Sequence, residues 1–266
     1  RKHLSAVSGG RLARRGRAHR IEVLAISDVA GDRLDVLGSG PFAPDPTSYA
    51  DALHAFDRAD PQLRLPGPVR AHLAAGARGE TEETPKPRDP VFARVRTTVL
   101  ANNATALRAA GAAAAEDGWC PVILEEALGG EARTVGRRLG ALAVAVASAR
   151  PICLIAGGES TVRVRGAGKG GRSQEIALAA ALELRGHAGS GILAAGTDGT
   201  DGPTDAAGAY ADGETVERGR ERGVDAGAAL ATNDSYAFFA AEGGLFRTGP
   251  TLTNVRDMAL LEIGPR

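Results

Sequence analysis

The sequence lacks long apolar runs and net charge, and it contains only two cysteines. No window approaches the roughly 18 apolar residues of a membrane span, so no transmembrane helix is predicted. Equal numbers of acidic and basic residues give no reason to expect nucleic acid or a membrane as a partner. Cys120 and Cys153 each lie beside a run of aliphatic residues. We therefore expect two buried free thiols in a reducing compartment, and neither a disulfide nor a metal site.

The signatures of hydrolases and metal centres are also missing. The sequence has no Gly-x-Ser-x-Gly segment and no cysteine–histidine pair that would indicate a nucleophile. Its five histidines show no metal-ligand spacing. The basic residues 1–20 are interrupted by glycines and contain no apolar core, which argues against a targeting segment.

One pattern recurs five times: a short apolar run that ends abruptly in small or polar residues. Such runs predict strands that are buried on both faces, as in parallel sheets. Alanine- and leucine-rich stretches of helical character lie between them, so strand and helix alternate and an α/β fold is expected. The expected strands are 23–26, 99–101, 122–124, 152–156 and 192–195, and the expected helices are 69–77, 104–116, 131–149, 174–185 and 213–222.

A glycine-rich loop, 166–172, joins the expected strand 161–165 to a helix that begins near Ser173. Glycines allow a close approach of backbone to ligand, and a helix N-terminus favours anions. Lys169 and Arg172 add two cations, so we favour phosphate or carboxylate binding over the alternative of a flexible hairpin tip with solvated charges. The glycine spacing matches neither the P-loop nor the dinucleotide fingerprint.

An acidic loop, 196–205, follows the strand expected at 192–195. Asp198, Asp201 and Asp205 share it with Thr197 and several glycines. Clustered carboxylates and hydroxyls suit Mg²⁺ or a polyol-like substrate, whereas the alternative is a turn that folds on its own side-chain hydrogen bonds. We favour the first because ligands of open parallel sheets bind at the carboxyl ends of the strands.

Three further polar segments are each weak evidence for a binding site when taken alone. Asn233 and Asp234 precede an apolar stretch, where either of them could simply cap a helix. The second segment, 27–32 with Ser27 and Asp28, directly follows an expected strand, and the third, 247–251 with Asn254 and Asp257, is a polar turn near the terminus. Gly157, Gly158, Glu159 and Ser160 likewise follow an expected strand.

Taken together, these segments resemble the glycerate 2-kinase family of the MOFRL type, whose members are often labelled hydroxypyruvate reductase. The matching segments run in order over nearly the whole chain. They are 1–5, 9–12, 27–32, 38–41, 45–47, 157–161, 168–175, 197–205, 233–236, 248–251 and 253–255.

The resemblance implies transfer of a phosphate group from ATP, with Mg²⁺, to the 2-hydroxyl of D-glycerate in the cytoplasm, by a protein that could form a homo-oligomer. It also implies two three-layer α/β/α units with largely parallel sheets and a cleft between them, divided as 1–150 and 151–266. Arg172, Lys169 and Asp198 are the expected catalytic residues, and Asp198 and Asp201 the expected metal ligands. The expected binding residues are Gly157, Gly158, Glu159, Ser160, Gly168, Gly170, Gly171, Thr197, Asp201, Asp205, Asn233, Asp234, Ser27 and Asp28.

Some features depart from the family pattern. Ala30 replaces its usual proline, Ser173 an asparagine and Leu252 a glycine. Family members also carry a glycine-rich segment with a catalytic lysine ahead of the part matched by Arg1, so we expect this chain alone to be inactive. Two alternatives stay open: a hydroxypyruvate reductase, for which the loop 166–171 is a poor dinucleotide match, and a non-catalytic binding module.

Overall fold

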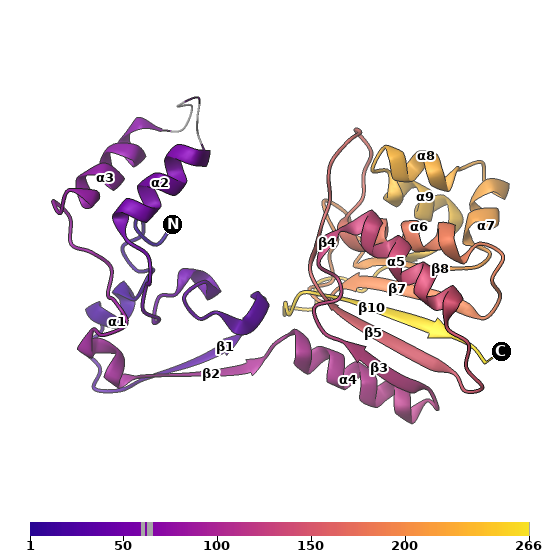
Figure 1. The fold of residues 1–266 in the computed structure, drawn as a ribbon, viewed down its shortest axis with the longest axis horizontal. Helices are drawn as coiled ribbons and strands as arrows, with labels where there is room; N and C mark the ends of the chain where they lie inside the picture. Colours follow the sequence, from indigo (N-terminus) through magenta and orange to yellow (C-terminus); the bar gives the residue numbers. More distant parts are fainter. Residues whose placement is uncertain (60–61, 63–65, 266) are drawn as a thin grey trace. The chain divides into compact units, whose positions relative to one another are not determined.

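The computed structural model describes residues 1–59, 62 and 66–265, which form two compact units (Figure 1). The first unit comprises 1–25 and 31–100, and the second comprises 26–30 and 101–266. The boundary expected before Pro151 falls inside the second unit, so the division of the chain into family domains at that point stays a prediction.

The first unit contains three helices and one strand pair among its described residues. These elements are α1 (Arg11–Arg15), β1 (Ile21–Ile26), α2 (Tyr49–Ala59), α3 (Gly67–Ala77) and β2 (Val95–Ala101). Helices α2 and α3 pack closely, because a Cβ on Gly76 would lie 2.2 Å from the Tyr49 ring. Strands β1 and β2 pair only with each other, and their residues alternate between half-buried and exposed.

The second unit is a three-layer α/β/α sandwich. Its six-stranded sheet has the order β3 (Cys120–Leu124), β5 (Ile152–Gly158), β10 (Asp257–Ile263), β7 (Ser190–Gly196), β8 (Gly208–Asp212), β9 (Leu245–Phe246). One face of the sheet carries α4 (Asn103–Glu116), and the other carries α5 (Ala132–Ala145) and α6 (Arg172–Leu184) (Figure 1). The C-terminal helices α7 (Thr215–Glu221), α8 (Ala226–Ala231) and α9 (Ser235–Glu242) gather on the side of α6, and a short pair, β4 (Gly130–Glu131) with β6 (Ser160–Thr161), stands apart.

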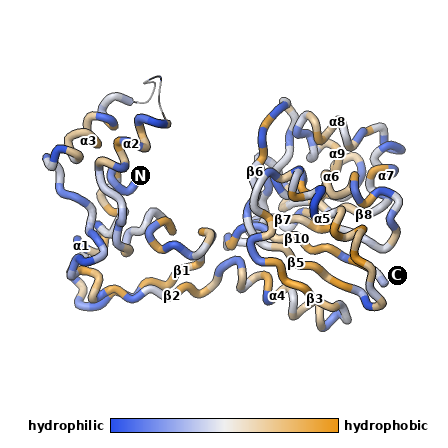
Figure 2. The backbone as a smooth tube through the Cα atoms, in the orientation of Figure 1, coloured by the Kyte–Doolittle hydropathy of each residue, from blue (hydrophilic) through white to orange (hydrophobic). Residues whose placement is uncertain are grey.

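Alternation along the central strands explains the two hydrophobic layers. Leu154 and Ala156 of β5 pack under α5 and α6, whereas Cys153 and Ile155 pack against Leu107 of α4. Because successive side chains of a strand point to opposite faces, a continuous apolar run supplies both cores. Figure 2 shows this hydrophobic colouring along β5 and β10. The predicted α/β class and the positions of all five predicted strands are confirmed. Burial on both faces, which was also predicted, holds for β5 and β7 but not for β1, β2 and β3.

The sheet is mixed rather than a simple parallel array. Strands β3 and β5 pair in parallel, and β7 runs in the same direction, as alternating strands and helices predict. The last strand, β10, enters between β5 and β7 and pairs antiparallel with both, and β8 pairs antiparallel with β7. The polar N-terminal end of β10 therefore lies at the carboxyl ends of β5 and β7, with Asp257 opposite both Gly158 and Gly196.

The two cysteines are unpaired, as predicted, but only one of them is buried. Both thiols are free, but Cys120 is exposed at the start of the edge strand β3, while Cys153 is buried. No described helix is long and apolar enough to cross a membrane.

Glycine sets the distance between α5 and α6. A Cβ on Gly136 would lie 2.2 Å from the backbone oxygen of Ile176, and one on Gly140 would lie 2.9 Å from that of Ala180. We predict that Gly136→Ala lowers the free energy of unfolding by about 1–3 kcal/mol through overpacking. Alanine would ordinarily stabilise a helix interior by about 1 kcal/mol relative to glycine.

Urea denaturation measures this change. Gly129→Ala is the control, since Gly129 is exposed and a Cβ there would lie 3.8 Å from the backbone oxygen of Glu126, an ordinary contact distance. A gain of stability in Gly136→Ala would show that the helices can separate at no cost.

Candidate active site

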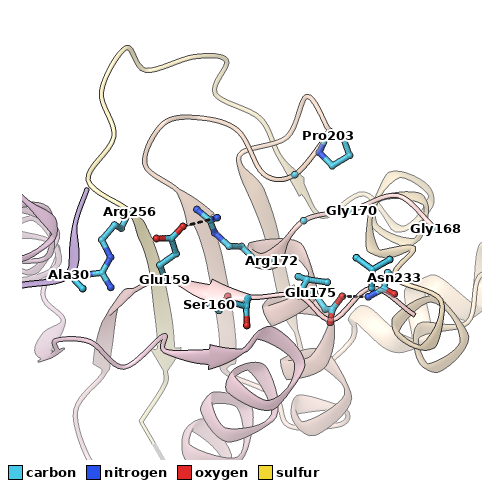
Figure 3. A pocket seen from close by; sticks show the side chains of 15 residues that line it. Ala30, Glu159, Ser160, Gly168, Gly170, Arg172, Glu175, Pro203, Asn233 and Arg256 are labelled. Carbon is cyan, nitrogen blue, oxygen red and sulfur yellow. Dashed lines mark hydrogen bonds and ion pairs between the residues drawn. The ribbon is translucent and has the colours of Figure 1, made fainter. Parts of the chain in front are cut away.

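A pocket of about 700 Å³ opens where β5, the glycine loop and the acidic loop meet (Figure 3). This volume lies within the range of small-molecule sites. Its lining combines charged groups, small residues and a few apolar side chains: Ala30, Glu159, Ser160, Thr161, Val162, Val164, Gly168, Gly170, Gly171, Arg172, Glu175, Gly202, Pro203, Asn233 and Arg256. The structure thus brings the predicted glycine loop and the 157–160 segment together.

Arg172, predicted as an anion-binding fork, is held by a buried carboxylate. Its Nε and Nη2 donate to the two oxygens of Asp257 at 2.5 and 3.0 Å, and its Nη1 lies 2.9 Å from Glu159. The Asp257 side chain is 2% exposed. Burial raises the pKa of Asp257, while the hydrogen bond from Arg172 opposes that shift. Arg172 is therefore fixed in place and is not a solvated loop charge.

Asp201 caps helix α6 through both of its carboxylate oxygens, and its expected role as a metal ligand stays a prediction. Its two carboxylate oxygens accept from the backbone N–H groups of Ser173 and Gln174 at 3.0 and 2.8 Å. These two N–H groups were expected to face a ligand, so the helix terminus itself is already occupied. Burial raises the pKa of Asp201 to about 6, against the opposing effect of the two backbone hydrogen bonds.

Asn233 fixes the start of the glycine loop. Its Oδ1 accepts from the N–H groups of Arg165 and Gly166 at 2.6 and 3.2 Å, and its Nδ2 donates to Glu175 at 2.9 Å. Glu175 in turn lies 3.1 Å from the guanidinium of Arg133, and both are buried. Asn233 adopts a positive φ of 58°, a conformation that asparagine tolerates better than most residues. It lines the pocket as predicted, but its amide is committed to positioning the loop.

The loop glycines are required by neighbours within the protein. A Cβ on Gly168 would meet Asp234 at 2.5 Å, one on Gly170 would meet Ser235 at 2.2 Å, and one on Gly171 would meet Asp201 at 2.2 Å. Asp234 also accepts from the Lys169 N–H at 2.9 Å. The prediction that these residues surround a ligand holds for their place in the pocket, while their small size is explained by packing.

Lys169 and Asp205 belong to an exposed cluster beside the pocket, not to its lining. The Lys169 ammonium lies 4.6 Å from the centre of the Tyr236 ring. The Tyr236 hydroxyl donates to Asp205 at 2.7 Å, and Arg247 donates to the same carboxylate at 3.0 Å. The Lys169 side chain thus contacts an aromatic face, and its expected catalytic role stays a prediction.

The end of β7 places Asp198 next to the central ion pair. A Cβ on Gly196 would lie 3.1 Å from Asp198 and 3.5 Å from Asp257. Asp198 Oδ1 accepts from the Thr200 N–H at 2.9 Å, and no described residue is hydrogen-bonded to Oδ2. Thr197 instead ties the last loop to β7, donating to Arg256 O at 2.7 Å and accepting from Val255 N.

The remaining predicted residues divide between packing and the pocket. Gly157 makes room for Asn103, whose amide donates to Asp257 O at 3.1 Å. The Ser160 hydroxyl is buried in the pocket wall without a hydrogen-bond partner among the described residues. Ser27 is buried and bonds its own turn, and neither it nor Asp28 lines the pocket.

Sequence reasoning missed Arg256 and its partner. Arg256 lines the pocket, its guanidinium is 7% exposed, and its two Nη atoms contact the two oxygens of Glu126 at 2.6 and 2.7 Å. This hydrogen bond, together with the nearby Glu159 and Asp257, raises the pKa of Arg256. Arg256 and Asp257 had seemed a polar turn, and their position between β5 and β7 depends on the pairing of β10.

Known proteins match the whole chain. Residues 152–257 match the MOFRL family and residues 1–74 match a domain of unknown function, DUF4147. A glycerate 2-kinase of Pyrococcus horikoshii is 40% identical over 98% of this chain and 59% of its own length. For a glycerate kinase of Macaca fascicularis the values are 34%, 100% and 78%.

Another relative and a solved structure agree with these matches. A protein of Agrobacterium vitis, 42% identical over 99% of this chain and 60% of its own length, is provisionally named a hydroxypyruvate reductase. The crystal structure of a Thermotoga maritima glycerate kinase is 39% identical, with a TM-score of 0.85 over 98% of this chain and 61% of that one. The chain thus spans about 60% of the length of several curated relatives.

The first prediction for this site concerns the ion pair between Arg172 and Asp257. Arg172→Ala leaves a buried carboxylate without its cation, which costs about 3 kcal/mol of unfolding free energy. Arg165→Ala removes an exposed pair with Glu131 and should cost less than about 1 kcal/mol. Chemical denaturation of both variants decides; equal effects would mean that Arg172 is a solvated charge after all.

The raised pKa of Asp201 makes a second prediction. The folded protein holds this proton more tightly than the unfolded chain, so the contribution of Asp201 is fully present below about pH 4 and is lost as the pH rises through about 6. A shift of this size corresponds to about 3 kcal/mol. The unfolding free energy of wild type minus that of Asp201→Asn should therefore fall between about pH 4 and pH 7.

Thermal and urea unfolding across this range test the sign. Asp205→Asn is the control, because Asp205 is exposed and the Tyr236 hydrogen bond lowers its pKa. The corresponding difference for Asp205 should not fall over the same range. A difference for Asp201→Asn that rises with pH would refute the burial argument.

Proposed function

Because this chain belongs to the glycerate kinase family, we propose that the protein carrying it transfers the γ-phosphoryl group of ATP to D-glycerate. The name of the Pyrococcus relative supports the 2-hydroxyl as the acceptor. The family resemblance is also the basis for proposing a cytoplasmic location, a homo-oligomer and the domain division 1–150 and 151–266.

The observation that carries this proposal is a set of backbone N–H groups in the glycine loop that have no acceptor among the described residues. The N–H groups of Gly166, Gly168 and Lys169 are hydrogen-bonded to protein oxygens. Those of Gly170, Gly171 and Arg172 have no acceptor among the described residues, and all three residues line the pocket. Unpaired backbone donors need a partner, and a row of them forms an anion cradle.

The charges around this cradle suit phosphoryl transfer. Catalysis of this reaction consists mainly of positioning and electrostatic stabilisation of phosphoryl oxygens. Arg172 supplies a fixed positive charge beside the three N–H groups, held there by Asp257. A preorganised charge costs no rearrangement at the moment of reaction. Ser160 adds an unpartnered hydroxyl on the same wall.

The residues present fit a magnesium ion carried by the nucleotide. The described part of the chain has no group of three or more potential ligands, as a cage built by the protein alone would need. Mg²⁺ usually binds one or two carboxylates together with substrate phosphates and waters. Asp198, with Oδ2 available, would hold it, and the ion would neutralise charge on the phosphates.

The geometry gives no support to a reductase. A dinucleotide site requires the glycine turn to follow a strand of the main parallel sheet. Here the loop follows β6, a two-residue strand that pairs with β4 outside the six-stranded sheet.

We predict that the protein carrying this chain releases ADP when ATP, Mg²⁺ and D-glycerate are present together. A coupled assay follows ADP, and phosphorus NMR identifies 2-phosphoglycerate as the product. Oxidation of NADH by hydroxypyruvate without ADP release would contradict the kinase assignment. Binding of ATP without turnover would indicate a binding module instead.

Within this assay, Asp198→Asn should lower kcat about tenfold to a hundredfold, because the amide keeps the size of the side chain but loses the charge. Asp205→Asn is the matched control in the same acidic loop, since Asp205 faces Tyr236 and Arg247 outside the pocket. Equal rates for the two variants would remove Asp198 from the site.

A further inference from the structure

The pocket contains a second arginine whose backbone is strained. Arg256 has a φ of 74°, a region that residues with side chains rarely adopt. Its N–H donates to Asn254 at 2.9 Å, and its carbonyl accepts from Thr197 N and Oγ1 at 3.1 and 2.7 Å. Such strain persists where surrounding bonds impose it, and it concentrates at ligand sites. The bonds around Arg256 therefore serve to direct one side chain into the pocket.

The two arginines of the pocket differ in how firmly they are paired. Asp257, the partner of Arg172, is 2% exposed, whereas Glu126, the partner of Arg256, is 58% exposed. Separating a buried pair leaves an uncompensated buried charge, which is strongly destabilising. A half-exposed carboxylate can return to water at little cost. Arg172 and Asp257 thus form a permanent pair. Arg256 is a buried cation whose partner, Glu126, can be exchanged.

We propose that Arg256 binds the carboxylate of the small hydroxy-acid substrate, and that Glu126 occupies its place when the substrate is absent. This assignment rests on the proposed function and names the residue that recognises the acid. Substrate binding then releases Glu126 to solvent and leaves the buried guanidinium paired.

Geometry favours a carboxylate over a phosphate at this position. Both Nη atoms of Arg256 already hold two oxygens of one planar carboxylate, at 2.6 and 2.7 Å. A substrate carboxylate can reproduce this bidentate arrangement without movement of the guanidinium. The phosphates have their own donors at Gly170, Gly171 and Arg172.

Calorimetric titration with D-glycerate and, separately, with ATP tests the assignment on the protein carrying this chain. Arg256→Gly should bind D-glycerate about tenfold to a hundredfold more weakly, with ATP affinity within about twofold of wild type. Glycine relieves the positive φ, so this variant should fold. Arg256→Lys should bind D-glycerate with intermediate affinity, because it keeps the charge and loses the fork.

The Glu126→Gln variant should change the affinity for D-glycerate in the opposite direction to the Arg256 variants. Removing the competing carboxylate should tighten D-glycerate binding about threefold, which a purely structural role for the pair would not do. Arg185→Gly is the matched control, because it breaks an exposed arginine–glutamate pair with Glu217 and does not line the pocket. It should leave both affinities unchanged.

The outcomes separate this assignment from the proposed function. Unchanged D-glycerate affinity in Arg256→Gly, a selective loss of ATP affinity, or no tightening in Glu126→Gln would overturn the assignment while kinase activity persisted. Wild-type protein that neither binds nor phosphorylates D-glycerate would remove the proposed function and the assignment together.

Discussion

The ion pair between Arg172 and Asp257 is the constraint on which the site depends. It joins the first residue of α6 to the first residue of β10, and β10 lies between β5 and β7. One carboxylate, 2% exposed, thereby links the glycine loop to the centre of the sheet. Because a buried charge must remain paired, the start of α6 cannot move relative to β10 without a large loss of stability.

This constraint divides the charges of the pocket into fixed and exchangeable ones. Asp201 accepts hydrogen bonds from the N-terminus of α6, and Asn233 accepts them from the start of the glycine loop. What they leave for a ligand is a short row of backbone donors, a fixed arginine and a second arginine with an exposed partner. Phosphoryl transfer to a hydroxy acid needs this combination: one anion cradle for phosphates and a separate fork for a carboxylate.

The sequence predicted the elements that carry β-branched or alanine-rich runs, and it failed where structure depends on distant pairing. Strand β10 reads Met-Ala-Leu-Leu-Glu, residues that favour helices, and it follows a polar turn. Its position between β5 and β7 is a property of the sheet, so Arg256 and Asp257 could not be recognised as site residues. The sequence could not show that Asp201 caps α6, because the backbone N–H groups that donate to it, at 173 and 174, lie 28 and 27 residues away. The position of the glycine loop was predicted correctly because its glycines and basic residues are adjacent in the sequence.

Double-mutant cycles on the two arginine pairs test the central claim most directly. The cycles combine Arg172→Met with Asp257→Leu, and Arg256→Met with Glu126→Leu, and they compare unfolding free energies. We expect a coupling of about 3 kcal/mol for Arg172 with Asp257 and a smaller coupling for Arg256 with Glu126, because the Glu126 side chain is 58% exposed. Equal couplings, or a stronger one between Arg256 and Glu126, would contradict the division into a permanent and an exchangeable pair.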